Sequence, residues 1–136
     1  MTIQPLQTEE TGSHYEILLR MRDEAGLLVS PDLFISAAER YGLIRTLGNW
    51  LIDESCRQIR AWRNQGLRMR VAINLSVHQL RQPDLAARIG AALQRNRLEA
   101  NVLTCEITAA WYSTWRRATT RTRSSMPSSS SPTPSA

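Results

Sequence analysis

The chain has 136 residues, a net charge of +5 and 42% hydrophobic residues, which suits one ordinary globular domain and is too short for two. No apolar run approaches the roughly 20 residues that cross a bilayer, and the acidic, polar start excludes a secretory signal, so we expect a cytoplasmic protein without a membrane segment. Residues 1–108 hold 13 Arg and all 12 acidic residues, whereas residues 109–136 hold four Arg and no acid. Because the excess charge lies in this last stretch, without a basic helix, nucleic acid is not an expected partner.

The first predicted elements are extended. Residues 2–6 contain Pro5, which restricts them to the edge or the start of a sheet. Residues 14–20 form a predicted strand that places Glu16 and Arg20 on one face. An ionised carboxylate inside a strand needs compensation, because removing its charge from water is costly. Two interpretations stay open here: a metal or other cationic partner for Glu16, or a surface pair of Glu16 with Arg20.

Two helices follow a turn at residues 23–26 and a short apolar run at residues 27–29. The first helix begins after Ser30, with Pro31 at its first position, and ends at Gly42. The second runs from about residue 45 to residue 65. We expect their apolar stripes in the core: Phe34, Ile35, Ala38 and Tyr41, then Leu47, Trp50, Leu51, Ile59 and Trp62. Cys56 and Cys105 are expected as small buried side chains rather than as a disulfide.

The remaining elements are a strand at residues 68–76, a helix at residues 84–96 and a strand at residues 102–108. The whole order is strand, helix pair, strand, helix, strand. This order is typical of crossover units, so it predicts an α/β fold with a largely parallel sheet.

Three polar side chains occupy equivalent places in the predicted strands. Glu16, Asn74 and Glu106 lie toward the C-terminal ends, in the phase opposite the apolar face. In a (β/α) barrel this phase points inward, and active sites form at the C-terminal ends of the strands. Oxygen ligands of this kind suit Mg²⁺, Mn²⁺ or Ca²⁺, so the pattern predicts a metal site.

Several motifs occur in a familiar order. Residues 15–20 read Tyr-Glu-Ile-Leu-Leu-Arg, residues 30–43 contain Ser-Pro and later Ala-Ala-Glu-Arg-Tyr-Gly-Leu, residues 74–76 read Asn-Leu-Ser and residues 106–108 read Glu-Ile-Thr. From about Ile3 to Thr108 the chain resembles the EAL domain family of bacterial cyclic di-GMP phosphodiesterases, with Ile17 where the name-giving alanine usually stands.

The resemblance implies part of a modified (β/α)₈ TIM-like barrel that holds Mg²⁺ or Mn²⁺ at its strand ends. There a metal-activated water opens one phosphodiester of cyclic di-GMP to give the linear dinucleotide. Carried over, Glu16, Asn74 and Glu106 are metal ligands and Arg20 contacts a substrate phosphate. Gln4 is a further substrate-binding candidate if residues 3–6 correspond to the family's N-terminal Gln-Pro-Ile motif; the alternative is that they follow it.

The resemblance stops after Thr108, where Ala109 stands in place of the family's acid. The paired aspartates, catalytic lysine and further glutamate of the family have no counterpart, and the chain contains no lysine. We therefore expect residues 1–108 to be the N-terminal portion of a truncated EAL domain, inactive as this chain. Residues 109–136, rich in Ser, Thr, Pro and Arg, are expected to be a disordered tail.

The alternative function is a non-catalytic module that docks on another EAL protein or on a diguanylate cyclase, or that forms a homodimer.

Overall fold

The computed structural model describes residues 2–5 and 14–107, with side chains described from His14 onward. The predicted tail at residues 109–136 lies outside these residues. In chain order the elements are β1 (Thr2–Pro5), β2 (His14–Leu18), β3 (Met21–Arg22), β4 (Leu28–Val29), α1 (Pro31–Arg40), α2 (Ile44–Asn64), β5 (Arg70–Leu75), α3 (Val77–Leu80), α4 (Leu85–Arg95), a 3₁₀ turn (Ala100–Val102) and β6 (Leu103–Ile107).

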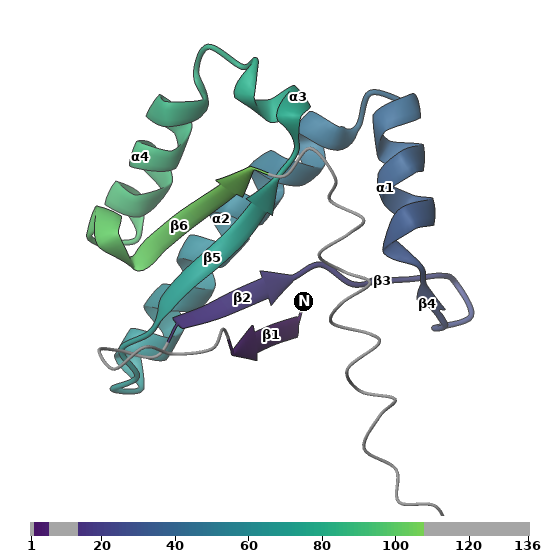
Figure 1. Ribbon diagram of the computed structural model, residues 1–136. Coiled ribbons are helices and arrows are strands. Elements are labelled where there is room, and N and C mark those ends of the chain that lie inside the picture. The colour runs from purple at the N-terminus through teal and green to yellow at the C-terminus, as the bar shows by residue number, and fades with distance from the viewer. Residues whose placement is uncertain (1, 6–13, 108–136) are drawn as a thin grey trace, which may run out of the picture.

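Four strands form the main sheet, in the order β1-β2-β5-β6. β5 pairs in parallel with both β2 and β6, so the arrows of these three strands point the same way in Figure 1. β1 runs antiparallel to β2 at the edge, where Pro5 is tolerated. The predicted parallel α/β sheet is confirmed, and the C-terminal ends of β2, β5 and β6 meet at one edge.

The main core lies between this sheet and two helices. α2 runs behind β5, and α4 packs beside α2 (Figure 1). Strand residues at alternate positions face these helices, because successive side chains of a strand point to opposite sides. The buried cluster contains Ile17, Val71, Ile73 and Leu75 from the strands with Leu51, Ile52, Cys56, Ile59, Leu85, Ala92 and Leu93 from the helices. One face of the sheet therefore packs against α2 and α4, and the other face points away from these helices.

α1 forms a second cluster with the start of α2, in which Phe34, Ile35, Ala38 and Ile44 are buried. The prediction of a core position is wrong for two residues. Tyr41 is 71% exposed because α1 ends at Arg40 and leaves Tyr41 as its C-cap. Trp50 is 49% exposed because it lies on the side of α2 opposite the buried stripe.

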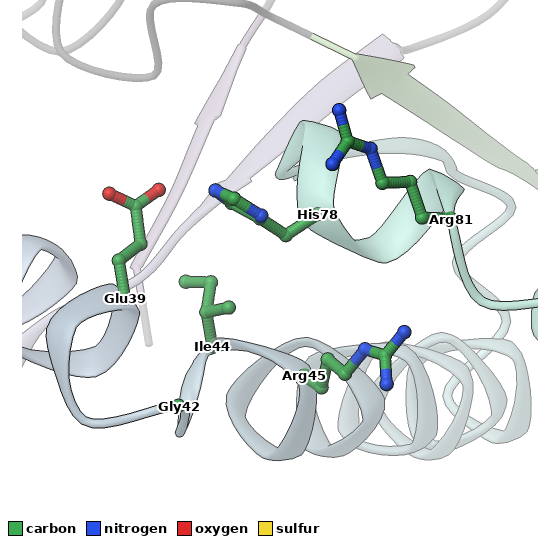
Figure 2. Close-up of a pocket in the computed structure, with 6 residues that line it drawn as sticks. All are labelled: Glu39, Gly42, Ile44, Arg45, His78 and Arg81. Atoms are coloured by element: carbon green, nitrogen blue, oxygen red, sulfur yellow. The ribbon is translucent and has the colours of Figure 1, made fainter.

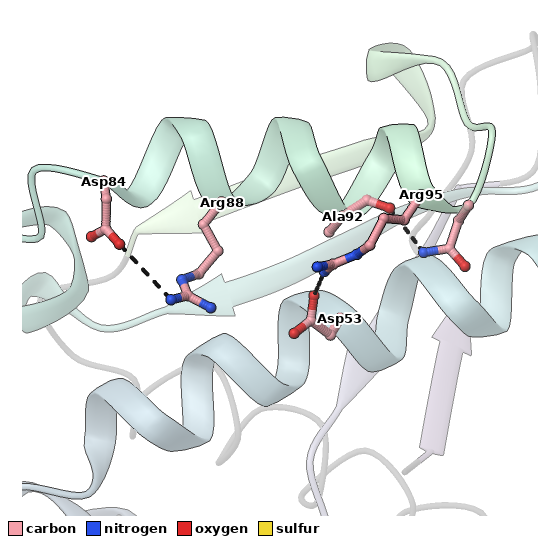
Figure 3. A network of polar contacts seen from close by, with 6 residues as sticks. Asp53, Asp84, Arg88, Ala92 and Arg95 are labelled. Atoms are coloured by element: carbon pink, nitrogen blue, oxygen red, sulfur yellow. Dashed lines mark hydrogen bonds and ion pairs between the residues drawn. The ribbon is translucent and has the colours of Figure 1, made fainter.

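Polar contacts dock α4 on α2 and close its ends. Figure 3 shows the Arg95 guanidinium donating to Asp53 Oδ1 of α2, and an Asp84–Arg88 ion pair of 3.8 Å at the start of α4. Asn96 Nδ2 donates to the Ala92 carbonyl oxygen over 2.8 Å. The Arg95–Asp53 pair joins the two helices, whereas the other two contacts lie at the ends of α4 itself.

Two short elements were missed. β2 ends at Leu18 rather than at residue 20, and the next residues form the β3–β4 hairpin. The hairpin is closed by Leu27 N–H donating to Asp23 Oδ1, and Gly26 supplies the positive φ of the turn. α3 fills the connection after β5. Within the described residues, none of the helices combines the length and apolar character needed to span a membrane.

Candidate functional site

The backbone brings three polar side chains to the face of the parallel sheet that lies opposite α2 and α4. Glu16 is the middle residue of β2, whereas Asn74 and Glu106 are next to last in β5 and β6. Asn74 pairs directly with Glu106, and Glu16 pairs with Ala72, two residues before Asn74. Because residues two apart share a face, all three side chains lie on the face opposite α2 and α4.

Glu16 and Asn74 are in direct contact. Asn74 Nδ2 donates a hydrogen bond to Glu16 Oε1, and both side chains are buried, at 7% and 4% exposure. Glu106 is half-buried beside them. The interpretation of Glu16 as a surface residue is therefore wrong: its carboxylate is enclosed, and its amide partner comes from the neighbouring strand.

The electrostatics of the site favour a cation. Burial raises the pKa of the Glu16 carboxyl, the Asn74 hydrogen bond opposes this rise, and the negative charge of Glu106 adds to it. The two carboxylates therefore repel one another across β5. A cation held between them would reverse both effects.

The donor set fits a hard divalent cation. Asn74 Oδ1 is buried and has no hydrogen-bond partner among the described residues, although an amide oxygen normally accepts at least one. Carboxylate and amide oxygens are the ligands that Mg²⁺ and Mn²⁺ prefer. Among residues 14–107 no group of three His, Cys, Asp or Glu side chains is placed to hold a metal ion. The described part thus supplies two carboxylates and one amide.

The two substrate-binding candidates lie in β1 and directly after β2. Gln4 pairs with Glu16 in the β1–β2 register, while its side chain lies outside the described part. Arg20 follows β2 and is half-buried; its Nη1 donates to the Leu19 carbonyl oxygen over 3.0 Å. Burial lowers the pKa of the Arg20 guanidinium. Both residues therefore flank the strand that carries Glu16.

A cavity of about 330 Å³ opens where α1, α2 and α3 meet (Figure 2). Glu39 of α1 and His78 of α3 face each other across it, with Ile44 between them, whereas the Arg45 and Arg81 guanidiniums point to different sides. These basic groups do not converge on one point. The cavity is lined by His78 of α3, and α3 is the helix that follows β5 and Asn74 in the chain.

Sequence reasoning missed one buried polar residue next to the site. Gln79 of α3 is fully buried, and its Oε1 accepts from the Ser76 backbone N–H over 3.3 Å. Ser76 followed three residues later by Gln is a pattern typical of a helix start, so the cap was visible in the sequence. The contact of the Gln79 side chain with α2 was not visible in the sequence.

A parallel sheet with helices on one face, and two carboxylates and an amide on the other, is typical of part of an α/β barrel. The chain belongs to the EAL domain family, whose sequence profile matches residues 1–126. The match continues to residue 126, past Thr108, where the quoted motifs end and where the resemblance is expected to stop.

Curated relatives support this membership. The chain is 40% identical over 93 residues to the signaling protein YkoW of Bacillus subtilis, covering 68% of this chain and 12% of YkoW. It is 38% identical over 94 residues to the bifunctional diguanylate cyclase/cyclic di-GMP phosphodiesterase MucR of Pseudomonas aeruginosa, covering 68% of this chain and 14% of MucR. The chain thus spans a small part of the length of these relatives.

Solved structures agree on the fold. The cyclic di-GMP complex of the MucR phosphodiesterase superposes with a TM-score of 0.64 at 34% identity, covering 77% of this chain and 43% of that chain. The FimX EAL domain of P. aeruginosa bound to cyclic di-GMP gives 0.71 at 25% identity, covering 88% and 48%. The fold is therefore part of an EAL barrel.

Proposed function

We propose that this chain supplies part of a cyclic di-GMP phosphodiesterase site. Glu16, Asn74 and Glu106 hold Mg²⁺ or Mn²⁺, and Arg20 contacts a phosphate of the cyclic dinucleotide. The observation that carries the proposal is that two carboxylates and an orphaned amide oxygen lie together on one face of the sheet, with Glu16 and Asn74 buried and Glu106 half-buried. Membership of the EAL family and the cyclic di-GMP named for MucR and FimX support the choice of ligand.

Each residue has a defined task in this proposal. A bound divalent cation lowers the pKa of a coordinated water and offsets negative charge on a phosphodiester. The Asn74 amide nitrogen fixes one Glu16 oxygen, while its own oxygen stays available. The Arg20 guanidinium suits phosphate because its planar fork of N–H donors matches phosphate oxygens.

Binding without turnover is the expected behaviour of these 136 residues. The last acid in the sequence is Glu106 and lysine is absent, so the paired aspartates and the lysine implied by the EAL resemblance are not supplied by this chain. We propose residues 1–108 as the barrel portion and residues 109–136 as a separate tail. On this view the chain is a metal- and nucleotide-binding portion of an enzyme site.

Calorimetry with Mn²⁺ tests the proposal, using the folded full chain and the variants Glu16→Gln and Glu106→Gln. We expect the wild type to bind Mn²⁺ and each variant to lose at least about tenfold in affinity. Glu24→Gln is the matched control, because Glu24 is exposed in the β3–β4 turn and its substitution removes the same charge. A folded wild-type chain that does not bind Mn²⁺ would refute the metal site.

Cyclic di-GMP tests the second half of the proposal. We expect Mn²⁺-dependent binding of cyclic di-GMP that is weakened in Arg20→Ala, and no linear dinucleotide after prolonged incubation, as measured by chromatography. Turnover that disappears in Glu16→Gln would show that these residues suffice for catalysis and would overturn the expectation of inactivity.

A further inference from the structure

Gln79 stands out because it is a fully buried polar side chain directly beyond the strand that carries Asn74. It belongs to α3, which starts after Ser76, two residues past Asn74. Its backbone N–H donates to the Ser76 carbonyl oxygen over 2.9 Å, while its Oε1 accepts from the Ser76 N–H over 3.3 Å. Gln79 therefore fixes both backbone groups of Ser76.

The same carboxamide rests on α2. A Cβ built on Gly48 would lie 1.6 Å from Gln79 Nε2 and 2.0 Å from its Cδ, so only glycine leaves room for the carboxamide. A glycine inside a helix costs about 1 kcal/mol relative to alanine. The space that Gly48 leaves for the Gln79 carboxamide explains why α2 contains a glycine here despite that cost.

The two polar atoms of the Gln79 carboxamide differ in their surroundings. Gln79 Nε2 is buried and has no hydrogen-bond partner in the part of the chain that the structure describes, and an unmet buried donor costs about 1–3 kcal/mol. An apolar side chain of similar length would avoid this cost but would leave the N–H of the buried Ser76 without its acceptor. The carboxamide oxygen, by contrast, makes a bond that methionine cannot replace.

We propose that Gln79 is a positioning residue: by locking Ser76 to the backbone of α2 at Gly48, it holds the end of β5 so that the Asn74 amide faces Glu16. Leu75, between Asn74 and Ser76, is fully buried and leaves the chain little freedom to compensate. The effect on Asn74 stands on the contacts alone. Only its consequence for cation binding rests on the proposed function.

NMR of the full chain reads the Asn74 side-chain amide directly. In the wild type, the hydrogen bond to Glu16 should protect the Asn74 Nδ2 protons from exchange with solvent. In Gln79→Met we expect a chain that still folds and in which this protection falls at least about tenfold. Gly48→Ala, which displaces the carboxamide, should have the same effect. His78→Ala is the matched control, because His78 is exposed on the same helix (Figure 2).

These measurements distinguish a positioning role of Gln79 from a role in stability alone. Unchanged Asn74 protection in Gln79→Met and Gly48→Ala, or unfolding of Gln79→Met, would overturn the proposal. A parallel Mn²⁺ titration separates it from the proposed function: Gln79→Met should weaken Mn²⁺ binding about as much as it loosens Asn74. If the wild type does not bind Mn²⁺ but Asn74 responds, the metal site fails and the positioning role stands.

Discussion

Asn74 occupies the place where the two carboxylates of the site meet. It donates to Glu16 and pairs with Glu106 across the β5–β6 register, so one uncharged amide separates two acids. Amides at such places relieve repulsion by donating to one carboxylate. Replacing this amide by a third acid should therefore increase the repulsion between the carboxylates of the site.

Asn74→Asp should lower the free energy of unfolding by about 1–3 kcal/mol in EDTA, because it removes the donor to Glu16 and adds a like charge. Mn²⁺ should restore most of this loss, since a ligand of the folded state stabilises it. Thermal melts with EDTA and with Mn²⁺ measure both effects. Asn101→Asp, at an exposed position, is the control. Equal melts of the two variants in both conditions would contradict the prediction.

Cys56 should make the free energy of unfolding depend on pH in the alkaline range. Burial raises the pKa of its thiol to about 11, with smaller contributions from Asp53 and Cys105 in the same direction. Since the folded pKa lies above the ordinary value of 9.0, this contribution to the free energy of unfolding is complete below pH 9 and is lost as the pH rises through 11.

Urea unfolding at a series of pH values checks this sign. The wild type should lose stability above pH 9 more steeply than Cys56→Ala, which lacks the thiol. The difference between the two curves cancels the titration of the tyrosines, which both chains share. Parallel curves would show that Cys56 does not titrate in a buried place.

At the level of elements, α4 shows which contacts hold a helix on this fold. Leu93 is buried in the core, whereas the Arg95–Asp53 pair lies at the surface (Figure 3). Leu93→Ala should lower the free energy of unfolding by about 2–5 kcal/mol, because it leaves a cavity. Arg95→Ala should cost less than about 1 kcal/mol, because water screens exposed pairs. Urea unfolding separates the two, and a larger loss for Arg95→Ala would reverse this ranking.

The elements with a strong periodic pattern were predictable from sequence. α1, α2 and α4 carry apolar stripes with helix-ending residues, and β5 alternates along its length, so their bounds agree within a few residues. The β3–β4 hairpin and α3 were missed because elements of two or four residues have no measurable period. Such elements are set by tertiary contacts, as the Gln79 carboxamide on Gly48 shows.

The candidate site was predictable in its face but not in its contacts. Alternation alone put Glu16, Asn74 and Glu106 on one side of the sheet, and the parallel register brings them together. The direction of the Asn74 hydrogen bond and the orphaned oxygen depend on side-chain orientations. No pattern along the chain encodes these orientations.

Across the whole molecule, β5 is the strand on which the fold depends. It pairs with β2 on one side and β6 on the other, α2 covers it, and Val71 to Leu75 are all buried. β1 has one neighbour and lies at the edge of the sheet. Amides that open only in global unfolding exchange slowest, and those at edges exchange through local opening.

Hydrogen exchange followed by NMR should therefore rank the strands. We expect β5 amides to exchange slowest, with free energies of opening that approach that of global unfolding, and β1 amides to exchange fastest. Leu93→Ala should speed exchange of the β5 amides in proportion to its loss of stability, whereas β1 amides should change little because their opening is local. Equal exchange of β1 and β5 would mean that this part of an EAL barrel opens as a single unit, with the edge strand as firmly held as the centre.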